Sequence, residues 1–62
     1  MPTLQDAISQ AVDAQPGHVS IAEAIRRVRQ IVRTSAPDVE LQNLIGTAAA
    51  YRWKPILFDR VK

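Results

Sequence analysis

The sequence has no cysteine, one histidine and two glycines. Without cysteine, neither disulfides nor thiolate-held zinc can brace the fold. The single histidine, His18, follows Gly17 in a predicted turn, and we interpret it as a turn residue rather than a ligand or a base. Hydrolytic triads, metal sites and glycine-rich phosphate loops therefore have no support in the sequence. We expect a non-enzymatic protein with no cofactor and no metal ion.

Long apolar runs and an early basic cluster are also missing. The longest stretch without charge runs from Leu41 to Tyr51, about half of what a membrane-spanning helix needs. The first basic residue is Arg26, so the amino terminus lacks the charged region of a secretory signal. These absences predict a cytoplasmic protein that makes no membrane contact.

The chain is also short, at 62 residues, of which 47% are hydrophobic. A chain of this size hides only roughly 60% of the surface that it exposes when unfolded, so its core is marginal. We therefore expect one domain over residues 1–62. Its stability must come from well-formed helix packing or from association with another chain.

The sequence pattern predicts an all-α fold, a small three-helix bundle with a short extended C-terminal tail. Apolar residues recur at helical spacing in three stretches, and linkers of a few residues set consecutive helices antiparallel. The expected helices span residues 4–14, 21–33 and 38–52, and the tail spans residues 54–62. In the third helix, the expected core-facing residues are Leu41, Leu44, Ile45, Ala48 and Tyr51.

Local signals support these boundaries. Thr3 with Asp6, and Ser20 with Glu23, have the spacing of capping boxes. For the third helix the cap is either Ser35 or Asp38, because Pro37 suits the first turn of a helix.

The tail is rich in large apolar residues and begins next to Pro55. Proline pushes the preceding Lys54 towards extended dihedrals, so the third helix ends near Trp53. A lone strand is not stable, so the tail must lie on the bundle or pair with a strand from another chain. Trp53, together with Ile56 and Phe58 of the tail, either plugs one end of the bundle or forms an exposed apolar patch.

A second apolar face is predicted on the third helix, away from its core stripe. It carries Val39, Gly46 and Ala50, and Trp53 continues it. Gly46 and Ala50 have a small-xxx-small spacing that allows another helix to approach closely. The face serves either self-association or packing of the first helix within one chain.

Three arginines form a stripe on the second helix. Arg26, Arg29 and Arg33 fall within about 60° of one another on a helical wheel. The stripe is a contact for an acidic protein surface or for phosphates, or else a solvated face. A helix-turn-helix reading places these arginines too far from the start of the helix to reach base edges.

The leading functional hypothesis is a small helical interaction protein that forms a homodimer. Its association residues are Val39, Gly46, Ala50 and Trp53, covered by Ile56 and Phe58. The arginine stripe, Arg26, Arg29 and Arg33, then contacts an acidic partner. The alternative is a DNA-binding transcriptional regulator that uses the same stripe.

Overall fold

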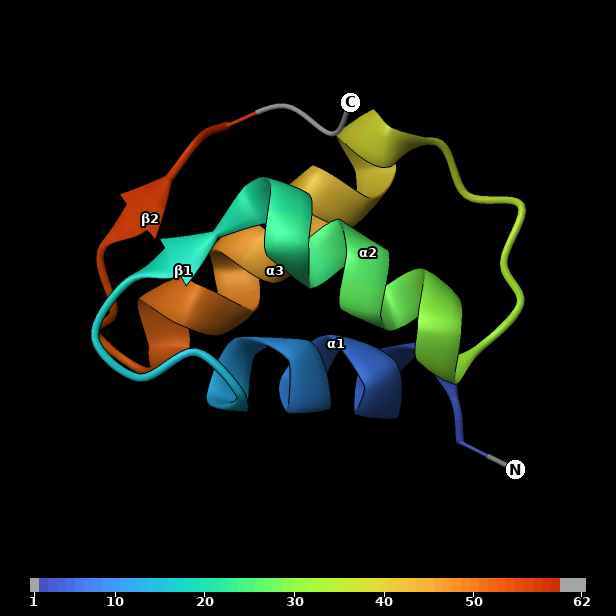
Figure 1. The fold of residues 1–62 in the computed structure, drawn as a ribbon, viewed down its shortest axis with the longest axis horizontal. Helices are drawn as coiled ribbons and strands as arrows, with labels where there is room; N and C mark the ends of the chain where they lie inside the picture. The colour runs from blue at the N-terminus through green and yellow to red at the C-terminus, as the bar shows by residue number, and fades with distance from the viewer. Residues whose placement is uncertain (1, 60–62) are drawn as a thin grey trace.

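The computed structural model describes residues 2–59 and is mostly helical (Figure 1). Its elements, in chain order, are α1 (Leu4–Asp13), β1 (Val19–Ser20), α2 (Ile21–Ile31), α3 (Asp38–Tyr51) and β2 (Ile56–Leu57). The helical class is as predicted, but an all-α bundle leaves out the two strands, which pair in parallel. Among the described residues, each helix is too short or too polar to cross a membrane.

The three helices enclose one apolar core. Figure 1 shows α1 running below α2, with α3 behind them, and the strands at one side of this group. The largest fully buried side chains come from all three helices and from β1, so the core reaches from the bundle to the small sheet. They are Ile8, Ile21, Leu41, Ile45, Val12, Val19 and Val28.

The start of α1 follows its prediction. The Asp6 backbone N–H donates to the Thr3 hydroxyl at 3.1 Å, and the Thr3 N–H donates to the Asp6 carboxylate at 3.2 Å. This reciprocal pair satisfies donors that the first helical turn leaves free. At the other end of α1, Gly17 takes a φ of 87°, a conformation that glycine adopts without strain.

The start of α2 is a capping box in part only. The Glu23 N–H donates to the Ser20 hydroxyl at 3.2 Å, as predicted. The Ser20 N–H, however, donates to the Gln15 side-chain oxygen at 2.9 Å. The Glu23 carboxylate instead lies beside Arg26 and Arg27, so contacts with Gln15 and with these arginines replace half of the predicted motif.

The end of α2 and the start of α3 differ from their predictions. α2 ends at Ile31, two residues before the predicted end, because Val32 is already extended. Neither Ser35 nor Asp38 caps α3; its N-cap is Pro37, which has no side-chain cap.

The tail lies on its own bundle, one of the two predicted placements. Val19 is in register with Ile56 and Ser20 with Leu57, and the Val19 N–H donates to the Pro55 carbonyl at 2.8 Å. In Figure 1 the tail passes along the outer side of β1. Residues 60–62 of the predicted tail lie outside the described residues.

Candidate functional site

The site begins where α3 ends, at a tight reversal of the chain. The Trp53 N–H donates to the Ala50 carbonyl at 3.1 Å, and the Lys54 N–H donates to the Ala49 carbonyl at 3.0 Å. This is the bonding pattern of a Schellman cap, whose turning residue is normally glycine. Here that residue is Trp53, with a φ of 57°. Left-handed backbone costs a residue other than glycine about 1–2 kcal/mol, so the turn is strained.

The strained tryptophan is also almost free of contacts. Its exposed fraction is 94%, and that of Tyr51 is 81%. The two rings, with Thr47 and Ala50, line a shallow groove of about 460 Å³ on the outer side of α3. We call these four residues the aromatic groove. Contiguous exposed apolar patches mark interaction surfaces when they are large, whereas single exposed apolar residues are common.

The exposure of Tyr51 corrects one sequence-based expectation. Tyr51 was expected on the core face with Leu41 and Ile45, but it lies on the surface. The core space near the end of α3 is taken by Ala48 and Ala49, which are both buried. At 100° per residue, Tyr51 lies at the edge of the core arc, so its side chain is on the solvent side of a turn whose alanines are buried.

The six predicted association residues fall into two groups. Val39, Trp53 and Phe58 have exposed side chains, with fractions of 64%, 94% and 65%, and Ala50 is exposed as well. Gly46 and Ile56 instead meet each other within the chain: a Cβ on Gly46 would lie 3.9 Å from Cδ1 of Ile56. The side of α3 at Gly46 is thus covered by β2, not by α1. Their part in association stays a prediction.

Arg52, which lies between the two aromatic residues in the chain, is bound to α1 and to its own helix. Its Nε donates to the Asp13 carboxylate at 2.6 Å, and its Nη1 donates to the Ala48 carbonyl at 3.0 Å. The hydrogen bond from Arg52 holds the pKa of Asp13 below its ordinary value, with the charges of Arg52 and Lys54 adding to this and desolvation opposing it. The guanidinium is therefore directed at α1 and away from the groove.

Lys54 is also bound to α1. Its ammonium donates to the Val12 and Gln15 carbonyls at 3.0 and 3.2 Å. These carbonyls lie at and just beyond the end of α1, where unpaired acceptors attract a cation. Both cations that flank Trp53 are thus bound within the chain.

Asp59 joins the tail to the start of α2, and sequence reasoning did not find this role. Its carboxylate accepts from the Ser20 hydroxyl at 2.6 Å and from the Ala22 N–H at 2.7 Å. The hydrogen bond from Ser20, followed by the one from Ala22, lowers the pKa of Asp59. Desolvation raises this pKa by a smaller amount. An acidic group at a helix start is favourable, but 39 residues separate Asp59 from Ser20, so no local pattern indicates the pair.

The predicted arginine stripe is partly occupied by contacts within the chain. Arg29 lies 2.6 Å from the Asp38 carboxylate and also donates to the Ala36 carbonyl at 3.0 Å. Arg26 lies 3.6 Å from the Glu23 carboxylate. Arg33 is exposed. The structure therefore uses Arg29 to hold the α2–α3 loop, and binding by the stripe stays a prediction.

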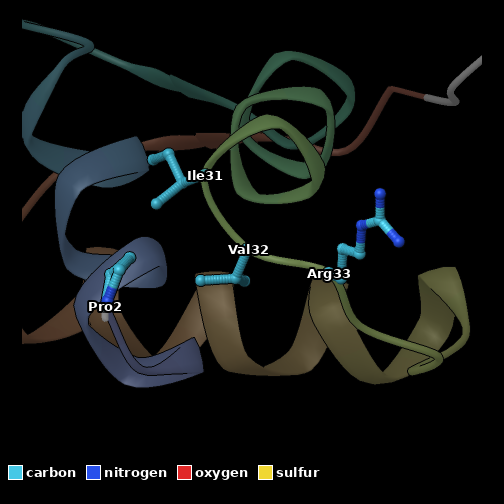
Figure 2. A pocket seen from close by; sticks show the side chains of 4 residues that line it. All are labelled: Pro2, Ile31, Val32 and Arg33. Carbon is cyan, nitrogen blue, oxygen red and sulfur yellow. The ribbon is translucent and has the colours of Figure 1, made fainter.

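A second hollow, of about 300 Å³, lies between the start of α1 and the end of α2. Pro2, Ile31, Val32 and Arg33 line it. Figure 2 shows the Arg33 side chain extending away from Pro2, so its guanidinium does not face the apolar side chains. Within residues 2–59, we find no group of histidine and carboxylate side chains of the size that holds a metal ion.

Comparison of the chain with protein-family models, curated proteins and solved structures finds no match. The candidate site therefore depends on geometry alone. Its main features are the exposed aromatic groove, the strained turn at Trp53 and the two inward-directed cations beside it.

Proposed function

We propose that the protein is a non-enzymatic interaction module that pairs with a second copy of itself. The association surface is formed by Val39, Ala50, Tyr51, Trp53 and Phe58. The observation that carries this proposal is Trp53, which is 94% exposed in a strained backbone conformation. Strained residues persist only where the surrounding structure holds them, and they cluster at functional sites; tryptophan is also enriched at interface centres.

The exposed area is of the right size for the centre of a dimer interface. The exposed fractions of Tyr51, Trp53 and Phe58 are 81%, 94% and 65%. Because an aromatic side chain can bury 150–250 Å², these three offer about 400–600 Å² together. A standard interface buries about 800 Å² on each partner, with a polar rim around an apolar centre. The exposed apolar area of the three rings is thus comparable in size to the apolar centre of such an interface.

The charges near this surface favour a second copy as the occupant. A two-fold interface brings the same patch together from both copies, and residues near the axis meet their own counterparts, so unpaired charges of one sign there would repel. Arg52 and Lys54, the cations beside Trp53, are bound to the Asp13 carboxylate and to α1 carbonyls. Two copies can therefore bring their aromatic residues together without an unpaired charge at the centre.

Sedimentation equilibrium tests this proposal. We expect a dimer at micromolar concentration, and we expect Trp53→Ala to weaken it at least about tenfold, as loss of a central interface residue does. Arg33→Ala is the matched control, because it removes an exposed side chain from the loop between α2 and α3, outside the proposed surface. A compact, stable monomer at high micromolar concentration contradicts the proposal.

The alternative of a DNA-binding regulator requires free guanidinium groups on α2. Arg29 is bound to Asp38, and Arg26 and Arg27 share Glu23. These ion pairs support the interaction module over the regulator. Binding to duplex DNA that falls steeply with salt, and that is lost when Arg26, Arg29 and Arg33 become glutamine, would reverse this preference.

A further inference from the structure

The tail, residues 54–59, is held by contacts that any copy of the chain can supply. Its strand bonds to β1, and Ile56 packs against Gly46 on α3. Asp59 accepts hydrogen bonds at the start of α2, from Ser20 and Ala22. Since every copy carries the same binding sites for the tail, the tail of one copy fits the body of another as well as its own. This equivalence is the basis of domain swapping.

The segment that joins the tail to α3 has the features of a strained hinge. Trp53 reverses the chain in left-handed conformation without a glycine. When the hinge opens, Trp53 can return to helical dihedrals, and the hydrogen bonds of the closed turn are replaced by those of a longer α3. Pro55 keeps Lys54 out of the helical region, so α3 ends there and the tail leaves it extended. Short hinges under strain favour exchange.

We propose that the two copies of the dimer exchange their tails, so that β2 of each copy pairs with β1 of the other. This inference rests on the proposed function, because it specifies how the second copy binds. It also explains why Trp53 stands where it does: the two hinges, each with an exposed indole, cross between the copies at the association surface. The strain at Trp53 then destabilises the closed monomer relative to the exchanged dimer.

Disulfide trapping distinguishes an exchanged dimer from one in which each tail stays on its own chain. The protein has no cysteine, so introduced pairs are unambiguous. Ser20 and Leu57 are opposed in the parallel ladder, at a separation that a disulfide spans. One protein carries Ser20→Cys and a second carries Leu57→Cys; the two are unfolded, mixed, refolded and oxidised.

Exchange predicts a covalent heterodimer in the mixture, and little covalent product from either variant alone. The chain carrying both substitutions gives the complementary result, because its disulfide joins two chains when the tails are exchanged and closes one chain when they are not. A dimer in sedimentation with only intrachain disulfides overturns the exchange and leaves the proposed function standing. A monomer at every concentration overturns both.

A pair of hinge variants provides a second, independent test. Trp53→Ala and Trp53→Gly both remove the indole, but only glycine relieves the left-handed strain. Relief favours the closed monomer roughly fivefold per hinge, so the dissociation constant of the Trp53→Gly dimer should exceed that of Trp53→Ala about 30-fold. Equal dissociation constants for the two variants contradict a hinge that opens at Trp53.

Discussion

Replacing Trp53 with glycine should stabilise the monomer, although it removes the largest side chain of the protein. The indole is 94% exposed, so its removal takes little packing from the folded state. Relief of the left-handed backbone contributes about 1–2 kcal/mol. Glycine loses about 0.5–1 kcal/mol more backbone entropy on folding than another residue would. The net expectation is a gain of about 0.5–1 kcal/mol in the free energy of unfolding.

For a domain of this size, that gain corresponds to a rise of about 2–8 °C in melting temperature. The assay is thermal unfolding followed by circular dichroism, at a concentration where the wild type is monomeric, so that association does not contribute. Trp53→Ala is the control, because it loses the indole and keeps the strain; its stability should stay within about 0.5 kcal/mol of the wild type. A glycine variant no more stable than the alanine variant refutes the strained turn.

Further variants at Asp59, Gly46 and Arg29 test the contacts that fold the tail and the loop. Asp59→Ala should lower the free energy of unfolding by about 1 kcal/mol, because a helix cap is lost. Because the pKa of Asp59 lies below its ordinary 3.8, this contribution is present above pH 3.8 and disappears as pH falls through the lowered pKa. Melting curves of the wild type and the variant should therefore converge in acid. Gly46→Ala should add about 1 kcal/mol of helix stability, because alanine is the better helix former and its methyl group meets Ile56 at an ordinary 3.9 Å. Gly46→Leu, in contrast, should displace the tail and lower the melting temperature. Arg29→Gln should lower the urea midpoint more than Arg26→Gln, because only Arg29 bridges to the α2–α3 loop; equal midpoints would show that this bridge adds nothing.

The helical part of the fold could be read from local patterns. The box at Thr3 and Asp6 and the turn at Gly17 act over three or four residues, and both are present as predicted. The apolar face of α2 is buried at Ile21, Ile25 and Val28, because apolar residues at helical spacing lie on one side of a helix.

Part of the candidate site could be predicted from the sequence. The sequence places Trp53 before Lys54-Pro55 and so predicts that α3 ends there. It does not predict the left-handed turn, which a tryptophan adopts only because Lys54 and the tail are held elsewhere: by α1 carbonyls and by β1. Tyr51 was misplaced in the core, because a periodic pattern cannot show where the bundle ends.

The sequence by itself determined the helical class, the positions of three helices and the absence of a covalent brace, since propensity, capping and periodicity act within a few residues. Only the tertiary structure decided that Val19 and Ile56 form a parallel pair, that Asp59 caps α2 and that Gly46 lies under the tail. These contacts join residues that are far apart in the chain. Their partners become known only when the helices have packed and brought the tail beside β1, the start of α2 and the middle of α3.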